Sequence, residues 1–235
     1  GGNVARMVAL AAGLPEAVPA ITLDSKCCGG GDAVQMAMHM LGAGAADIVL
    51  AGGVESFSTA PRRIKRGRDG APDQEYHRPP FSPWPERDPD MIAAAAHLAK
   101  HKQISRTAQE EFAIKSHQKA QAAQVDLRAE IVAIADVTED AFTRTLSPKL
   151  CAKLPLLAGD KDTGVTAATT AVEADGAALC VLLSEKALND HAELKPHAIK
   201  LRGATSVGSD PALPGLAPIA AIEKLLHQLD LSCAN

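Results

Sequence analysis

The sequence contains few aromatic residues and lacks any long uninterrupted apolar run. Aromatic side chains account for 3% of its 235 residues, although 46% of the residues are hydrophobic. A core of Ala, Leu, Val and Ile suits close packing of helices against a sheet, and the length is enough for one large domain or two small ones. Charged residues, glycine or proline interrupt every apolar stretch before it could cross a bilayer. We therefore expect an α/β protein that does not span a membrane.

An excess of positive charge is also missing. The formal net charge is -4 and the pI is near 6.1, whereas nucleic-acid-binding domains are usually basic. The chain does not open with a basic segment followed by an apolar one, so no secretory signal is visible. We expect no nucleic-acid partner. Because residue 1 is not Met, we also expect the chain to begin inside a longer gene product.

The cysteines form no pattern that is typical of a disulfide framework or a zinc site. Their number is odd, and no two of them are separated by two residues. The eight histidines add no set with metal-ligand spacing. We therefore expect no metal ion and a reducing, cytoplasmic location. The cysteines are Cys27, Cys28, Cys151, Cys180 and Cys233.

Alternating helical and strand-like patterns at the start of the chain support the α/β class. Residues 4–12 have the apolar spacing of a helix, and residues 18–24 are typical of a short strand. Residues 32–44 are apolar almost all round, which predicts a helix buried between layers. Residues 47–52 form a continuous apolar run, which is typical of a strand covered on both faces. Together these segments predict a βαβ unit with parallel strands.

The composition changes between Ser58 and Pro89, where Arg, Pro, Gly and Asp dominate. A segment this long without regular structure is unusual inside a compact domain and tends to be functional or disordered. Regular patterns then return. Helices are predicted at 91–101, from Ser105 or Thr107 onward with Thr107 and Glu110 spaced as a capping box, at 147–153, at 184–190 and at 218–229; strands are predicted at 130–138, at 176–183 as a buried strand, and at 197–206 as an edge strand.

Cys27 lies in the turn between the first predicted strand and the helix that follows it. A thiol just before a helix faces the positive end of the helix dipole, and backbone N–H groups there favour thiolate over thiol. The three glycines at 29–31 let the backbone turn sharply and leave room beside the sulfur, and the first N–H groups of the helix can serve as oxyanion donors. Taken alone, the turn leaves other possibilities open: a small buried hydrophobe, or a redox pair or soft-metal site with Cys28.

Residues 18–61 run from the strand-like segment through Cys27 and the helix into a second strand that ends in Gly52-Gly53-Val54-Glu55-Ser56. This block resembles the active-site region of the thiolase family, in which a Cys followed by small residues precedes a helix and a Gly-Gly-Val-Glu-Ser signature. The signature and the loop that follows it argue against a β-ketoacyl synthase relative. Further similarity lies at residues 2–6, 13–15, 104–106, 166–167, 175–178, 210–211 and 215–218.

The resemblance implies a thiolase-like layered α/β/α fold with an inserted, mainly helical loop domain. Residues 1–57 would belong to the N-terminal α/β half that carries the nucleophile, and residues 58–164 would form the loop domain. Residues 165–235 would contain the end of the N-terminal half and the start of the C-terminal half. The resemblance also implies a homodimer or homotetramer.

The implied chemistry is acyl transfer in acyl-CoA metabolism. Cys27 would attack the thioester of an acyl-CoA and form an acyl-cysteine during Claisen condensation or thiolytic cleavage of a 3-ketoacyl-CoA. The partners would be acyl-CoA and CoA, with CoA acting as substrate carrier and no other cofactor. Glu55 would be structural and hold its turn. Because the chain stops before the family's Asn-Glu-Ala-Phe and Gly-His-Pro motifs and its second catalytic cysteine, we expect a fragment that lacks both ends and is inactive alone.

Several positions depart from the family pattern. Thr169 and Ala171 occupy a block in which the family usually has Asn and a Ser beside the pantetheine arm, and Asp90-Met91 stands where His-Met often lines the acyl pocket. With Pro218, these four are the predicted substrate-binding and CoA-binding residues. Asp24 also replaces the usual Asn, and Cys28-Gly29 replaces the usual Gly/Ser pair. The departures favour an alternative function: a non-catalytic, thiolase-like acyl-CoA-binding or lipid-binding protein, or a structural subunit.

A basic stretch follows the signature. It could be a solvated loop, or it could attract the phosphates of CoA or the acidic face of a carrier protein. The sequence leaves both possibilities open. Its residues are Arg62, Arg63, Lys65, Arg66 and Arg68.

Overall fold

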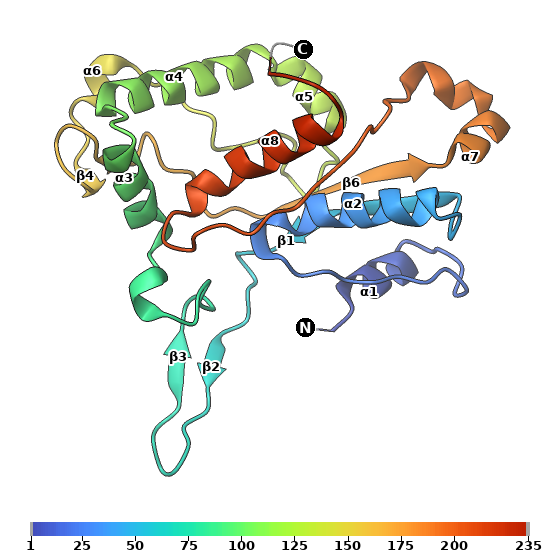
Figure 1. The fold of residues 1–235 in the computed structure, drawn as a ribbon, viewed down its shortest axis with the longest axis horizontal. Helices are drawn as coiled ribbons and strands as arrows, with labels where there is room; N and C mark the ends of the chain where they lie inside the picture. Colours follow the sequence, from blue (N-terminus) through green and yellow to red (C-terminus); the bar gives the residue numbers. More distant parts are fainter. Residues whose placement is uncertain (1, 234–235) are drawn as a thin grey trace. The chain divides into compact units, whose positions relative to one another are not determined.

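The computed structural model describes residues 2–233, which divide into two compact units (Figure 1). Within the described residues, the first unit comprises 2–60, 174–206 and 221–233, and the second comprises Pro61–Glu173 and Val207–Ala220. These are units of spatial packing, and the domain boundaries expected from the resemblance stay a prediction. No helix among the described residues has both the length and the apolar character needed to cross a membrane.

The first unit is built on a two-stranded antiparallel sheet with a helix packed against it. Strands β1 (Ile48–Glu55) and β6 (Gly176–Leu183) pair along their whole length, from Ile48↔Leu183 to Glu55↔Gly176. Helix α2 (Gly29–Gly42) packs against both strands. The remaining elements of this unit are α1 (Val4–Ala11), the 3-10 turns η1 (Lys26–Cys28) and η3 (Ala192–His197), and α7 (Glu185–Asp190).

The prediction of a parallel βαβ unit is wrong. β1 pairs antiparallel with β6, and residues 18–24 form no strand. The backbone of this segment is bonded to α1 side chains instead of to a neighbouring strand. Asn3 Nδ2 donates to the carbonyl of Ala20 at 2.7 Å, and the Arg6 guanidinium donates to the carbonyls of Val18 and Glu16 at 2.5 and 2.8 Å.

The sheet is also less covered than its apolar sequence predicts. Ala51 is buried, and the side chains on the opposite face of β1 are exposed because the described residues cover only the face next to α2. On β6, Leu179 and Val181 are exposed opposite Gly52 and Leu50, and the burial of this strand does not alternate, because residues 176–181 are all exposed. The exposed apolar side chains are Ile48, Leu50, Val54, Leu179 and Val181, with exposed fractions of 50–64%.

The second unit is mainly helical. Its core is formed by Leu146, Cys151 and Ala168, against which Ile114 and Leu154 pack. A β-hairpin interrupts the segment that was predicted to lack regular structure. The elements are β2 (Arg63–Lys65), β3 (Gln74–Tyr76), the 3-10 turn η2 (Pro85–Arg87), α3 (Met91–His101), α4 (Arg106–Ala122), α5 (Gln124–Glu130), α6 (Pro148–Cys151), β4 (Leu156–Ala158), β5 (Val165–Thr166) and the 3-10 turn η4 (Pro214–Leu216); α8 (Ala217–Gln228) starts in this unit.

Two predicted strands and one predicted cap differ from the structure. Residues 130–138 contain only an isolated bridge between Ile134 and Val137: Glu130 ends α5, and none of the described strands pairs with the residues that follow. Residues 197–206 form no strand, and none of the described strands pairs with them. The capping box at Thr107 is wrong: Ser105 caps α4 by accepting the N–H of Ala108 at 3.2 Å.

Glu110 forms an ion pair inside the helix instead of capping it. Arg106 Nε lies 2.7 Å from Glu110 Oε1, and Arg106 Nη2 donates to the carbonyls of Cys151 at 2.8 Å and Leu154 at 3.0 Å. Both charged side chains are shielded, with exposed fractions of 19% for Arg106 and 11% for Glu110. Arg106 therefore joins α4 to the end of α6.

We expect Arg106→Met to lower the free energy of unfolding by about 3 kcal/mol, because it leaves a shielded carboxylate without its partner and two carbonyls without a donor. Urea unfolding followed by circular dichroism measures this change. Arg62→Met is the matched control, since the Arg62–Glu75 ion pair is largely exposed and should contribute nothing measurable. Equal urea midpoints for the two variants would contradict the role given to Arg106.

Candidate active site

Cys27 lies in the 3-10 turn η1, directly before α2, and its side chain is exposed. Lys26, the residue before it, has a φ of +56°, a left-handed conformation that is uncommon for residues other than glycine. Asp24 Oδ1 accepts the N–H of Lys26 at 3.0 Å, and the carbonyl of Ser25 accepts the N–H of Cys28 at 3.3 Å. The predicted turn and helix are thus present, and the predicted strand before them is replaced by extended chain.

The glycines of the signature bring the first turn of α2 close to the end of β1. A Cβ placed on Gly30 would lie 3.5 Å from the Cα of Gly53, and a Cβ on Gly53 would lie 3.3 Å from the Cα of Gly30. A Cβ on Gly30 would make an ordinary contact, whereas one on Gly53 would require α2 to move slightly away from the strand. The glycines therefore allow a close approach of the first turn of α2, directly after Cys27, to β1.

The segment after β1 is bonded to the residue before β6. The backbone N–H of Ser58 donates to Asp175 Oδ1 at 2.8 Å, and the Ser58 hydroxyl donates to Asp175 Oδ2. These bonds hold the pKa of Asp175 below its ordinary value of 3.8, with the Ser58 hydroxyl as the largest cause and the Ser58 N–H as the next. Glu55 bonds locally, by accepting the N–H of Ser56 at 3.1 Å.

This bond predicts a contribution to acid unfolding. Above pH 3.8 the Asp175 carboxylate is charged in both states, so its hydrogen bonds stabilise the fold fully; as the pH falls below 3.8 and through the lower folded-state pKa, the stabilisation is lost. We expect the melting temperature to fall less steeply below pH 3.8 in Asp175→Asn than in the parent. Ser58→Ala should give an intermediate slope, and parallel curves for all three proteins would refute this role of Asp175.

The other five predicted site residues all belong to the second unit and occupy three places in it. Asp90 is the N-cap of α3, where its Oδ1 accepts the N–H groups of Ile92 at 2.9 Å and Ala93 at 3.2 Å. Met91 is the first residue of α3 and is half-exposed. Pro218 is exposed in the first turn of α8.

Thr169 and Ala171 follow β5. The Thr169 hydroxyl accepts the N–H of Thr166 at 3.0 Å and donates to the Thr166 carbonyl at 3.2 Å, so it closes a local turn. Ala171 is exposed. The polar groups of Asp90 and Thr169 therefore have local structural roles. These roles could not be predicted by comparing each residue with the residue that the family usually has at that position.

The sequence did not predict that Arg78 bonds to the segment directly before Asp90 and holds it in place. Arg78 Nη1 lies 3.0 Å from Asp88 Oδ1, while Arg78 Nη2 donates to the carbonyls of Asp88 at 3.2 Å and Pro89 at 3.1 Å. The guanidinium also lies 4.8 Å from the centre of the Phe81 ring. Arg78 holds the pKa of Asp88 below its ordinary value. The local sequence signal for these bonds is weak: Arg78 and Asp88 are ten residues apart, and each is followed by proline.

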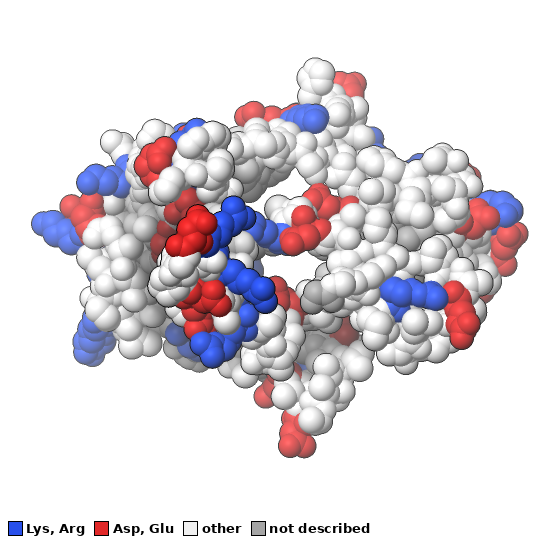
Figure 2. All heavy atoms as spheres, turned by 90° about the horizontal axis from the view of Figure 1, so that it is seen from below, with Lys and Arg blue, Asp and Glu red and all other residues white. Residues whose placement is uncertain are grey.

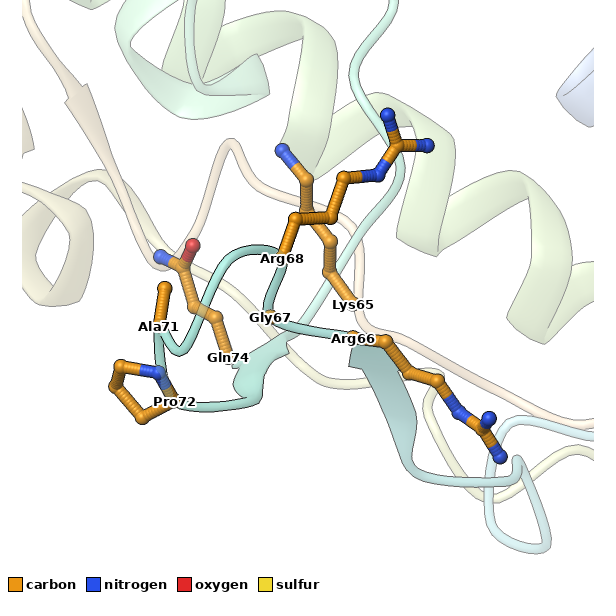
Figure 3. Close-up of a pocket in the computed structure, with 7 residues that line it drawn as sticks. All are labelled: Lys65, Arg66, Gly67, Arg68, Ala71, Pro72 and Gln74. Atoms are coloured by element: carbon orange, nitrogen blue, oxygen red, sulfur yellow. The ribbon is translucent and has the colours of Figure 1, made fainter.

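The basic stretch forms strand β2 and the start of the loop that leads to β3. Lys65, Arg66 and Arg68 line an open groove at this loop, together with Gly67, Ala71, Pro72 and Gln74. Figure 3 shows that Lys65 and Arg68 extend to one side of the loop whereas Arg66 points away from them. Acidic side chains lie among the Lys and Arg side chains on the face seen in Figure 2. The cations therefore do not converge on one point. Among residues 2–233, no three His, Cys, Asp or Glu side chains are placed to hold a metal ion.

The sequence model of the thiolase N-terminal domain matches residues 1–186. The chain belongs to the thiolase family. It is 35% identical, over its whole length, to "Putative acetyl-CoA C-acetyltransferase VraB" of Staphylococcus aureus (strain MRSA252), and 38% identical, over 99% of its length, to "Putative acetyl-CoA C-acetyltransferase YhfS" of Bacillus subtilis (strain 168). It covers 63% and 61% of these proteins, so the chain spans less than two thirds of the length of these curated relatives.

A solved structure shares the fold. The crystal structure of the Acat5 thiolase from Ascaris suum, in complex with coenzyme A, superposes with a TM-score of 0.82 at 26% sequence identity. The match covers 100% of this thiolase chain and 63% of the Acat5 chain. The predicted family and the predicted thiolase-like α/β fold are confirmed.

Proposed function

We propose that the full-length protein is a thiolase-type acyltransferase of acyl-CoA metabolism and that Cys27 carries the acyl group. The observation that carries this proposal is the exposed Cys27 between the left-handed Lys26 and the start of α2, whose Gly30 lies close to Gly53 of β1. Membership of the thiolase family supports it. Cys28 is also exposed, and Cys27 is preferred because it stands at the position of the family's nucleophile.

In the proposed first step, the Cys27 thiolate attacks the thioester carbonyl of an acyl-CoA. The new carbon–sulfur bond to Cys27 forms, the bond to the CoA sulfur breaks, and CoA leaves as a thiolate that takes up a proton. The N–H groups in the first turn of the 14-residue helix α2 can stabilise the oxyanion. Transfer of the acyl group to the α-carbon of a second acyl-CoA, with loss of its proton, gives condensation. In thiolysis, Cys27 attacks the keto carbon of a 3-ketoacyl-CoA, the bond between that carbon and the α-carbon breaks, and acetyl-CoA leaves after its α-carbon takes up a proton. The thiol of free CoA then attacks the acyl-cysteine, so that a shortened acyl-CoA forms and the Cys27 sulfur is released.

The partner proposed for this site is acyl-CoA or CoA. The Acat5 thiolase, which shares the fold, is described in complex with coenzyme A. Met91, Ala171 and Pro218 offer exposed apolar surface to a substrate, whereas Asp90 and Thr169 would contact it only through the acceptor sites left by their local bonds. We further propose that the full-length protein forms a homodimer or homotetramer and is located in the cytoplasm. CoA would be its only substrate carrier.

The hairpin cations would attract CoA phosphates at long range, because they do not converge on one point as a fitted phosphate site would. We expect the double variant Arg66→Gln/Arg68→Gln to raise KM for acyl-CoA about threefold at low ionic strength, with kcat unchanged. The difference should vanish at about 0.5 M salt, because salt then screens charges beyond a few ångströms. A KM that stays raised at high salt would indicate direct phosphate contacts instead.

Consumption of a 3-ketoacyl-CoA by the full-length protein in the presence of CoA tests the proposed function. We expect two acyl-CoA products whose acyl carbons sum to those of the substrate. The second candidate is a non-catalytic acyl-CoA-binding protein, favoured by the local structural roles of Asp90 and Thr169. Binding of CoA without turnover across short, medium and long acyl chains would favour that candidate and overturn the first.

A further inference from the structure

The carboxylate of Asp32 joins three segments around the Cys27 turn. Asp32 lies in the first turn of α2, and the hydroxyl of Ser206 donates to its Oδ1 at 3.0 Å and lies 3.1 Å from Gln35 Oε1. The pKa of Asp32 is held below its ordinary value by the side-chain hydrogen bond from Ser25 first and by that from Ser206 second. Since Ser25 precedes Cys27 by two residues, Asp32 connects the turn, α2 and the segment that ends at Ser206.

The turn needs such a connection because it is strained. Lys26 has a φ of +56°, and a residue with a Cβ holds this conformation only where its surroundings fix the chain on both sides. Asp24 Oδ1 accepts the N–H of Lys26 on one side. On the other side α2 follows Cys28 directly, and the Ser206 hydroxyl holds the first turn of this helix by its bond to Asp32.

We propose that Asp32 is a positioning residue for Cys27: its carboxylate accepts the Ser206 hydroxyl and thereby holds the first turn of α2, which fixes the chain directly after the turn that presents the thiol. Its catalytic meaning rests on the proposed role of Cys27. The carboxylate also places a negative charge in the first turn of α2, directly after the Cys27 turn, so Asp32 holds this helix start while opposing thiolate formation.

Other charged groups occur on the turn and on the elements that pack against α2, and most of them have local partners. Asp24 is bonded to the Lys26 N–H, Glu55 to the Ser56 N–H and Asp175 to Ser58. They are unchanged in an Asp32 variant, so a difference between the variant and the parent reports Asp32 alone. The charged residues on or next to these elements are Asp24, Lys26, Asp47, Glu55, Asp175, Glu185 and Lys186, with His39 in the last turn of α2 and Lys200 and Arg202 in the segment before Ser206; Asp47 is paired with Lys186.

The test compares Asp32→Asn with its parent in the full-length protein, both carrying Cys28→Ala so that only one thiol of the turn can react. Asn offers one acceptor oxygen and cannot take both hydroxyl bonds in the same way. Two quantities are measured: the rate of Cys27 alkylation by iodoacetamide as a function of pH, followed by mass spectrometry, and kcat and KM for acyl transfer. We expect the midpoint of the alkylation profile to fall by about 0.5 pH unit and kcat to fall about tenfold with KM unchanged.

Two further variants separate the bond from the charge. Ser206→Ala keeps the charge of Asp32, so we expect a parental alkylation midpoint with kcat lowered about threefold. Asp126→Asn removes an acidic residue from the first turn of α5, far from Cys27 in sequence, and should change neither quantity. Loss of fold stability alone would lower the amount of active protein and would not move the midpoint.

Parental midpoint and kcat in Asp32→Asn would overturn the proposal, and an acyl group still found on Cys27 would leave the proposed function standing. Should the parent never acquire an acyl group on Cys27, the proposed function fails, and the alkylation midpoint alone then decides the positioning claim. If Asp32→Asn yields too little folded protein, Ser25→Ala and Ser206→Ala replace it; parental kcat in both would overturn the proposal.

Discussion

Cys27→Ala abolishes acyl transfer: we expect kcat/KM of the full-length protein to fall by at least about 10³-fold. Without the sulfur no acyl-enzyme forms, and only substrate binding and the oxyanion donors of α2 remain. Cys27 is exposed in η1, so its removal creates no cavity in the core and should leave the melting temperature unchanged. Initial rates of 3-ketoacyl-CoA consumption at several substrate concentrations measure the effect.

Cys28→Ala is the matched control for this loss. Cys28 is the next residue, carries the same thiol group and is also exposed. It is the N-cap residue of α2, and its side chain makes no capping hydrogen bond. We expect it to retain kcat/KM within about threefold of the parent, a difference of less than 1 kcal/mol. A large loss in Cys28→Ala with parental activity in Cys27→Ala would transfer the nucleophile role to Cys28.

Gly52→Ala is expected to have the largest effect on folding, a loss of more than about 4 kcal/mol in the free energy of unfolding. A Cβ at this position would lie 2.0 Å from the carbonyl oxygen of Ala178 and 2.8 Å from the Cα of Leu179, both in the backbone of β6. The backbone of a paired strand cannot move aside as a side chain can, so β1 and β6 must separate there. Equilibrium urea unfolding, together with the yield of folded protein, measures the change.

Gly42→Ala provides the control for a glycine replaced in the same unit. Gly42 is the last residue of α2, and nothing lies within 4 Å of the Cβ that the substitution would add. We expect a gain of about 0.5 kcal/mol or no change, because Ala favours the helix over the unfolded chain. Similar losses in Gly42→Ala and Gly52→Ala would show that the clash with β6 is not the cause.

Helices with strong local signals could be predicted from the sequence. The predicted helix at 91–101 coincides with α3, whose Asp90 cap accepts two backbone N–H groups, and the helix started by Pro218 appears as α8. Strand pairing could not be predicted in the same way. Residues 18–24 have a strand-like pattern, yet Asn3 and Arg6 bond to the backbone of this region, and nothing in its own sequence encodes those partners.

The same distinction holds for the site. The position of Cys27 before a glycine-rich helix start is local and was predicted, and the role of Cys27 stays a prediction. Its supporting contacts were not predicted, because the bond between Ser58 and Asp175 spans 117 residues and that between Ser206 and Asp32 spans 174. Contacts at such separations depend on the folded chain, and a single sequence carries no pattern for them. Asp90 and Thr169, taken as substrate-binding residues, proved to have local structural bonds as well.

Mass spectrometry of the full-length protein after brief incubation with acetyl-CoA and acid quenching tests the central claim most directly. A thioester survives acid, so an acetyl group on the nucleophile remains for peptide mapping. The account predicts one acetyl group, located on Cys27 by fragmentation, present in Cys28→Ala and absent in Cys27→Ala. An acetyl group on Cys28, Cys151, Cys180 or Cys233 instead, or no acetyl group in a protein that binds CoA, would contradict it.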